Sequence, residues 1–354
     1  MLDYSFRGLP WNIVFGLGAL DRLPEELEKL GLNRAMVLTT PNQHGKGEAL
    51  LQLLGKQGAG LFDQARMHVP KETLESAREK AIELSADCTV SLGGGSTTGL
   101  GKALVMHQSL PNIAIPTTFA GSEMTNIWAV TQAGRKVTAR NDAVVPTLTI
   151  YDPQLTRSMP AKLAVVSGLN AMAQAVVNVA TDKPNPIVAA LALDGVRALV
   201  KALPVMVTNP DDMEAQAQAL YGASLAGAAL GTGTTSLHHK LCHTFGGTFN
   251  TPHAETHAIL LAHSVAYNAI AAAEGTARIA EVMGVKDAAM GIFELAQKLG
   301  APVALSEIGV LESDLDKAAE VTTENAFDNP EPVNRDRVRA LLQRAWEGLP
   351  PKGV

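Results

Sequence analysis

Most of the histidines in this chain lie close together in the sequence. Residues 238–263 contain six of the nine, namely His238, His239, His243, His253, His257 and His263. His239 and His243 are four positions apart and would share one helix face, while His253 follows a proline and should begin the next helix. One histidine alone is more often a hydrogen-bonded structural residue, but six in one segment predict at least one catalytic imidazole. The HExxH zinc motif is absent, since Glu255 stands one position too late.

A second chemical feature is the run of glycines and hydroxyl residues in DCTVSLGGGSTTGLGK, residues 87–102. Glycines after a strand let the backbone approach a pyrophosphate, and the start of a following helix favours its negative charge. The spacing is not that of the P-loop, since Ala103 follows Lys102, nor GxGxxG, since the third glycine comes late, at Gly99. The alternative is a plain tight turn. The hydroxyls of residues 96–98 favour phosphate binding over that alternative.

Hydroxyl residues also follow another expected strand, in IAIPTTFAGSEMTN, residues 113–126. Ligands of open α/β sheets lie at the carboxyl ends of strands, although a loop that caps a helix is the alternative here. Two such loops predict a bound dinucleotide. No acidic residue accompanies Thr39 and Thr40 after an earlier strand, so the sequence excludes neither NADH nor NADPH. The residues that we expect to bind this cofactor are Thr39, Gly93, Gly94, Gly95, Ser96, Thr97, Thr117, Thr118 and Ser122.

Composition limits the classes of protein that fit this chain. With 354 residues, 46% of them hydrophobic and 18% charged, it can form two buried cores. Its net charge of −6 argues against a nucleic-acid partner, although local histidines and lysines can still bind a small anionic substrate. Two cysteines, no signal peptide and no apolar run of membrane-spanning length predict a cytoplasmic protein without membrane contact.

Short apolar runs alternate with helical patterns in the first part of the chain. The expected strands are residues 35–39, 88–92, 113–115 and 147–151, and expected helices include 46–57 and 72–86. This alternation predicts a parallel, doubly wound sheet. Later segments are helical, namely 161–180, 189–203, 212–230, 275–300, 313–326 and 335–347, with Pro204 at a helix border. We therefore expect an α/β domain over residues 1–158, an all-α domain over residues 159–354, and a ligand in the cleft between them.

Together these motifs resemble one family. FGLG at 15–18, GGGSTTGLGKA at 93–103, PTTFAGSEMT at 116–125 and YDPQLT at 151–156 resemble the iron-containing alcohol dehydrogenase superfamily. LHHKLCHTFGGTFNTPHAETH at 237–257 and the ending from 328 to 348 are similar to its maleylacetate reductases. The resemblance implies a dehydroquinate synthase-like fold and a homodimer. It also implies the reduction of maleylacetate to 3-oxoadipate with NADH or NADPH, in the degradation of aromatic compounds.

In metal-dependent relatives of this superfamily, an aspartate and three histidines bind iron or zinc. The resemblance places the corresponding positions of this chain at Asn170, Gln174, His243 and His253. Maleylacetate reductases usually have the asparagine, but usually keep a histidine and a glutamate where this chain has Gln174 and Val177. Neutral amide oxygens are poor ligands for zinc and iron, and two histidines alone bind either metal weakly. We therefore predict a reductase that works without a metal.

The implied reaction tolerates the loss of the metal. Hydride transfer to a carbon–carbon double bond conjugated with a ketone gives an enolate, which needs charge stabilisation and a proton. We expect His243 and His253 to be the catalytic donors. The expected substrate-binding residues are Asn170, Gln174, His239 and Lys240. The alternative for Lys240 is a solvated surface charge.

Other functions remain open from the sequence. Gln174 and Val177 change the polarity of one helix face, which indicates either drift around a lost metal site or a changed substrate preference. The second enzyme hypothesis is therefore a related reductase or alcohol dehydrogenase for another short carbonyl acid. A third hypothesis is a binding protein that keeps the cofactor fold and has lost hydride transfer, against which the histidines and the hydroxyl loops argue.

Overall fold

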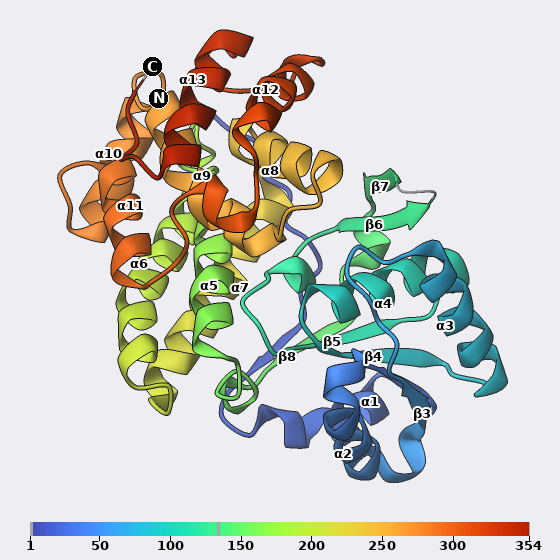
Figure 1. The fold of residues 1–354 in the computed structure, drawn as a ribbon. Helices are drawn as coiled ribbons and strands as arrows, with labels where there is room; N and C mark the ends of the chain where they lie inside the picture. The colour runs from blue at the N-terminus through green and yellow to red at the C-terminus, as the bar shows by residue number, and fades with distance from the viewer. Residues whose placement is uncertain (1–2, 133–134, 354) are drawn as a thin grey trace. The chain divides into compact units, whose positions relative to one another are not determined.

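The computed structural model describes residues 3–132 and 135–353 (Figure 1). These residues form two compact units: residues 8–159, and the residues from 160 onward together with the segment that ends at Arg7. The first unit contains the strands of the described chain, and the second is helical. The predicted fold class, an α/β domain and an all-α domain, is confirmed. Within the described ranges, no helix has both the length and the apolar character needed to cross a membrane.

The α/β unit is built on six parallel strands in the order β1-β8-β5-β4-β2-β3. The strands are β1 (Ile13–Phe15), β2 (Ala35–Leu38), β3 (Gly58–Phe62), β4 (Cys88–Gly93), β5 (Asn112–Pro116) and β8 (Leu148–Tyr151). The helices between them are α1 (Leu23–Lys29), α2 (His44–Leu54), α3 (Lys71–Glu83) and α4 (Gly95–Gln108). A separate antiparallel pair consists of β6 (Ile127–Gln132) and β7 (Arg135–Arg140).

Helices cover both faces of this sheet because its strands are apolar on both sides. Along β2, Ala35 and Val37 pack with leucines of α1 and α2, while Met36 and Leu38 pack with α3 and α4. Successive residues of a strand face opposite sides, so a strand between two helical layers has to be apolar throughout. All four of these side chains are completely buried. The sheet is therefore doubly wound, as predicted.

The winding direction changes at the carboxyl ends of β2 and β4. From β2 the chain passes through α2 to β3 on one side, and from β4 it passes through α4 to β5 on the other. Ligands of open α/β sheets bind at such a switch point, because the two loops diverge there. The loops that begin at Thr39 and Gly94 are the ones at this position.

Gly101 allows α4 to lie close to the sheet. A Cβ atom at this position would lie 2.4 Å from Asn112 Oδ1 and 2.4 Å from Ser91 Oγ. That asparagine oxygen accepts hydrogen bonds from the hydroxyls of Thr89 and Ser91, so moving it would break both. We expect Gly101→Ala to lower the free energy of unfolding by about 1–3 kcal/mol, the usual cost of overpacking.

Denaturant titration would measure this effect of Gly101. The matched control is Gly45→Ala in α2, where an added Cβ would meet no atom within 4 Å. We expect the control to be neutral or slightly stabilising, because alanine restricts the unfolded chain more than glycine does. Equal transition midpoints for the two variants would contradict the packing argument.

The second unit contains nine α-helices within its described residues. They are α5 (Ala161–Val176), α6 (Pro186–Thr208), α7 (Met213–Thr232), α8 (Leu237–Thr248), α9 (His253–Asn268), α10 (Ala273–Met283), α11 (Ala288–Lys298), α12 (Leu315–Thr323) and α13 (Arg335–Glu347). Helices α5, α6 and α7 pack against one another, and α9 packs against α5, α8 and α11. Small residues permit this packing. A Cβ at Gly195 would lie 3.0 Å from Gly222 O, and a Cβ at Gly222 would lie 2.9 Å from Gly195 O.

Some details of the predicted elements were wrong. The helix expected over 275–300 is two helices, α10 and α11, because Gly284 adopts a left-handed conformation (φ 70°) that ends the first. Pro204 lies inside α6, where burial against α5 and α7 outweighs the one backbone hydrogen bond that a proline removes. Strands β1 and β3 and the β6–β7 pair were not predicted.

Candidate active site

The glycine loop is a tight connection between β4 and α4. Only Gly94 separates the two elements. Gly93 has φ 148°, and a Cβ there would lie 2.7 Å from Thr97 Oγ1 and 2.8 Å from Gln43 Oε1. No side chain caps the amino end of α4, while Gly95 is exposed and Ser96 half-buried. The turn therefore needs glycine for steric reasons, and it leaves the first amides of the helix open to an anion.

The loops after β2, β4 and β5 meet at this turn. A Cβ at Gly94 would lie 2.9 Å from Thr118 Oγ1, and the Thr117 amide donates to Gly93 O at 2.9 Å. From the loop after β2, Gln43 Nε2 donates to Thr117 Oγ1 at 3.3 Å. The structure thus brings together most of the residues predicted for the cofactor. Gln43 was missed, because nothing in its sequence surroundings marks a ligand.

The remaining predicted cofactor residues differ in their access to a ligand. Thr97 is completely buried, and its hydroxyl donates to Gly94 O at 2.9 Å, which stabilises the turn. Thr39 is also completely buried, and its Oγ1 has no hydrogen-bond partner. Ser122 is half-buried, so its hydroxyl lies nearer to the surface. Direct contact with a nucleotide stays a prediction for all three.

Lys102 holds the second hydroxyl loop from the interior. Its Nζ lies 2.5 Å from Ser122 O, 2.6 Å from Thr125 O, and 3.0 Å from both Thr125 Oγ1 and Ile127 O. The side chain is completely buried, and burial lowers the pKa of Lys102 to about 7. A buried amine is tolerated only with such partners. This role was not predicted, although a lysine among the apolar residues of an expected helix is a signal for it.

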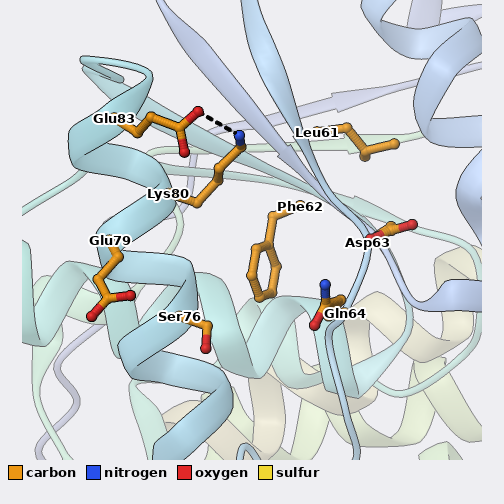
Figure 2. A pocket seen from close by; sticks show the side chains of 8 residues that line it. All are labelled: Leu61, Phe62, Asp63, Gln64, Ser76, Glu79, Lys80 and Glu83. Carbon is orange, nitrogen blue, oxygen red and sulfur yellow. Dashed lines mark hydrogen bonds and ion pairs between the residues drawn. The ribbon is translucent and has the colours of Figure 1, made fainter.

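A pocket of about 390 Å³ lies between β3 and α3, and none of its lining residues belongs to the glycine loop (Figure 2). It is lined by Leu61, Phe62, Asp63, Gln64, Ser76, Glu79, Lys80 and Glu83. Three of these residues carry carboxylates, and the single ammonium group, that of Lys80, pairs with Glu83 at 2.8 Å. An excess of negative charge disfavours a diphosphate, so we do not place the cofactor in this pocket.

In the helical unit, five of the six clustered histidines bring their rings together. His238, His239 and His243 lie on α8, and His253 and His257 lie on α9. Ring centroids are 4.4 Å apart for His253 and His257, 4.8 Å for His238 and His257, and 5.5 Å for His239 and His257. His243 lies at the edge of this imidazole cluster, 6.4 Å from His239. The shared face predicted for His239 and His243 therefore forms part of a larger group.

Asn329 helps to position the two helices that carry the cluster. Its Oδ1 accepts hydrogen bonds from the Leu237 amide at the start of α8 and from Asn268 Nδ2 at the end of α9, both at 3.1 Å. Its own Nδ2 donates to Asn268 Oδ1 at 2.7 Å and to Glu331 O at 2.7 Å. One asparagine thus joins the ends of both helices, which sets the register between their histidines.

Burial separates the histidines of the cluster into two kinds. His238 and His257 are buried, and burial is the main reason why the pKa of His238 falls to about 3 and that of His257 falls well below its usual value. His243 and His253 are exposed. The two rings that we expect to be catalytic are thus the accessible ones, and their catalytic role stays a prediction.

The other predicted residues of this region have different surroundings. His239 is buried and Lys240 is half-buried. His263 lies six positions after His257, about 240° around α9, and its ring faces Phe293 of α11 at 6.4 Å between centroids. His263 therefore does not belong to the imidazole cluster, which the sequence alone did not distinguish.

Asn170 and Gln174 lie one turn apart on α5, which packs against α9. Both are buried, and the Oδ1 atom of Asn170 has no hydrogen-bond partner. A buried amide oxygen without a partner is costly unless a ligand or a water molecule supplies a donor. The position is therefore compatible with the predicted binding of a substrate, which stays a prediction for both residues.

The residues present do not fit the iron or zinc of the metal-dependent relatives. The positions that correspond to the metal ligands include two neutral amides, Asn170 and Gln174, in place of an aspartate and a histidine. The single compact group of potential ligands found among the described residues is His238, Cys242 and His257. In a tetrahedral zinc site, two ligand nitrogens lie about 3.3 Å apart, and each directs its lone pair at the metal ion. His238 Nε2 and His257 Nδ1 are 2.9 Å apart, a hydrogen-bond distance.

Comparisons with known proteins decide the family. The model of the iron-containing alcohol dehydrogenases matches residues 10–153, and that of the C-terminal part of this family matches residues 164–346. The chain belongs to the iron-containing alcohol dehydrogenase family. A maleylacetate reductase of Burkholderia cepacia is 46% identical over 351 residues, which cover 99% of this chain and 100% of that protein. This chain is thus an oxidoreductase from the maleylacetate reductase branch of the family.

Solved structures agree with this assignment. The maleylacetate reductase of Agrobacterium tumefaciens is 46% identical, with a TM-score of 0.96 over 99% of this chain and 100% of that one. The sulfoacetaldehyde reductase of Bifidobacterium kashiwanohense, solved in complex with NAD⁺, is 22% identical with a TM-score of 0.87 over 98% and 99% of the two chains. The second likeness shows the fold alone.

Proposed function

We propose that this protein reduces maleylacetate to 3-oxoadipate with NADH or NADPH, without a catalytic metal. The observation that carries the proposal is the imidazole cluster with two exposed histidines, His243 and His253, in a chain similar over its full length to maleylacetate reductases. Accessible imidazoles are the groups that stabilise and protonate an enolate. Asn170 and Gln174 support a mechanism without a metal, because neutral amides stand at two of the positions that correspond to metal ligands.

The loops of the α/β unit are the cofactor site in this proposal. The open amides of Gly95 and Ser96 would bind the diphosphate, and Thr118 and Ser122 would add hydroxyl contacts. Gly95 is exposed at this turn, and because it has no Cβ its backbone can approach a ligand closely. The bound nicotinamide supplies the hydride. The absence of a carboxylate beside Thr40 keeps both NADH and NADPH possible.

His243 and His253 act on the substrate in this scheme. As a hydride is added at the carbon β to the ketone, the electrons of the double bond move toward the ketone and negative charge develops on its oxygen. A ring N–H that donates to this oxygen stabilises the enolate, and a proton from an imidazole or from a water that it binds completes the reduction at carbon. The two carboxylates of the substrate would contact Lys240, His239 and the amide side chains of α5.

The direct test combines a substrate assay with removal of metals. We expect the purified protein to oxidise NADH or NADPH in the presence of maleylacetate, and to keep its rate after exhaustive treatment with EDTA. Full loss of the rate with EDTA and its return with zinc or iron would contradict the metal-free mechanism. No oxidation of either nucleotide with maleylacetate would contradict the function itself.

A second candidate function is the reduction of another short carbonyl acid. It is favoured by Gln174 and Val177, which are both buried on α5 and its continuation, where relatives usually have ionisable side chains. A panel of short oxo acids and aldehydes, tested with both nucleotides, would separate the two candidates. A higher kcat/KM on another acid than on maleylacetate would favour this second one.

We also propose a cytoplasmic homodimer. Supporting the location, both cysteines, Cys88 and Cys242, are free and buried. Supporting the dimer, β1 is an edge strand whose Ile13 and Phe15 are about 40% exposed, and such an apolar edge is usually covered. Light scattering should give about twice the chain mass of 37.2 kDa, and a monomer mass would contradict the dimer.

A further inference from the structure

A chain of hydrogen bonds runs from the backbone of α9 into the imidazole cluster. The Ser264 hydroxyl lies 2.7 Å from Leu260 O, and because a carbonyl can only accept, the serine is the donor. Its single proton is then used. The contact of 3.3 Å between Ser264 Oγ and His238 Nδ1 therefore requires that the histidine donate. In its neutral form His238 thus carries its proton on Nδ1 and leaves Nε2 as an acceptor.

The next contact fixes the tautomer of His257. His238 Nε2 and His257 Nδ1 lie 2.9 Å apart, and one proton has to stand between them. Since His238 carries its proton on Nδ1, this proton belongs to Nδ1 of His257. Nε2 of His257 is then a bare acceptor. The side chain is only 2% exposed, and this nitrogen has no hydrogen-bond partner in the structure.

Neither the nearby thiol of Cys242 nor a second proton on His238 changes the tautomer assigned to His257. Cys242 Sγ lies 3.8 Å from His238 Nε2, a longer and weaker contact than the imidazole one. A second proton on His238 would reverse the chain, but the ring is fully buried and burial disfavours the charged form. Ser264 lies on α9 four residues after Leu260, so the start of the chain is fixed by regular helix geometry.

We propose that Ser264 and His238 are positioning residues, which hold His257 so that its Nε2 accepts a hydrogen bond from an O–H group in the substrate site. The ring of His257 lies 4.4 Å from that of His253, which places this acceptor beside an expected catalytic histidine, so the proposal rests on the proposed function. The O–H group belongs either to the enol form of the substrate or to a water molecule that binds between the substrate and His257. A carboxylate is excluded at this position, because it offers no proton.

The first test reads the tautomer directly and does not depend on activity. In the full-length protein labelled with ¹⁵N-histidine, we expect His257 to show a protonated Nδ1 and a bare Nε2, with the signals assigned by their loss in His257→Gln. Ser264→Thr should preserve this pattern, because it keeps the hydroxyl. Ser264→Ala should weaken the preference of His238 and His257 for these tautomers without reversing it, because Leu260 O remains as an acceptor for His238. A proton on Nε2 of His257 in the unsubstituted protein would overturn the proposal, whatever the substrate proves to be.

The second test asks where the O–H donor comes from. Adipate and 3-hydroxyadipate differ only by a hydroxyl group, and one neutral hydrogen bond corresponds to about fivefold to tenfold in affinity. If the substrate is the donor, the hydroxy acid should inhibit about that much more tightly, and His257→Leu should abolish the difference. If a water is the donor, the two acids should inhibit equally, while His257→Leu still raises KM for maleylacetate about tenfold with kcat changed less. His257→Gln, which keeps an acceptor, should recover part of the loss. No change of KM or of the inhibitor ratio in His257→Leu would overturn the proposal.

Discussion

Replacing His253 or His243 with alanine should lower kcat for maleylacetate by about 10²-fold or more, while the protein stays folded. Both side chains are exposed at the edge of a cluster whose inner members are buried, so alanine removes a donor without opening a core. The enolate then loses a hydrogen bond and the carbon loses a proton source. The expected loss falls on kcat more than on KM, because the charge on the ketone oxygen develops only in the transition state.

Stopped-flow and steady-state assays with both nucleotides would measure this loss. His44→Ala is the control, since His44 is an exposed histidine of α2 that contacts Asp63 and Glu48 and has no role in the proposal. Circular dichroism and nucleotide binding should be unchanged in all three variants. Rates within about threefold of the original in both His243→Ala and His253→Ala would remove these residues from the mechanism.

The parallel sheet could be predicted from the strands that are buried on both of their faces. The residues of β2 and β4 are apolar or small throughout, and such runs arise when helices cover both sides of a sheet. β3 was not predictable in this way, because its sequence GAGLF begins with residues of low strand propensity. It forms because it pairs with β2 and because α2 packs on it, so tertiary contacts decide its structure.

The histidine site was predictable only along each helix. Four-residue spacing predicted the shared face of His239 and His243, and the proline before His253 predicted the start of α9. The pairing of His238 with His257 could not be found, since the two residues are 19 positions apart on different helices. It depends on the packing angle of α8 and α9, which no local pattern encodes. The same holds for Gln43, which reaches the glycine loop only because β2 and β4 are neighbours.

Buried neutral histidines should make this protein sensitive to acid. Burial lowers the pKa of His238 to about 3 and that of His263 to about 4, whereas an unfolded chain binds these protons near pH 6.5. Below pH 6.5 the unfolded state therefore binds more protons than the folded state, and the free energy of unfolding falls as the pH is lowered. At pH 5 the loss is roughly 2 kcal/mol for each of these two residues, and above pH 6.5 neither contributes to the pH dependence.

His263 offers a clean test of this argument, because it lies outside the imidazole cluster. His263→Met replaces the ring with an apolar side chain of similar size, which cannot take up a proton. Denaturant titrations between pH 7 and pH 5 should show a loss of stability that is smaller by roughly 2 kcal/mol in the variant. His44→Gln is the control, because His44 affects the pH dependence of stability in the opposite direction. The hydrogen bond of His44 to Asp63 raises the pKa of His44, so this residue stabilises the folded protein at low pH and the contribution disappears as the pH rises. If His263→Met kept the full pH dependence of the original protein, the buried ring would have to be charged or hydrated in the folded state. The same doubt would then extend to the neutral tautomers of His238 and His257, on which the acceptor at His257 depends.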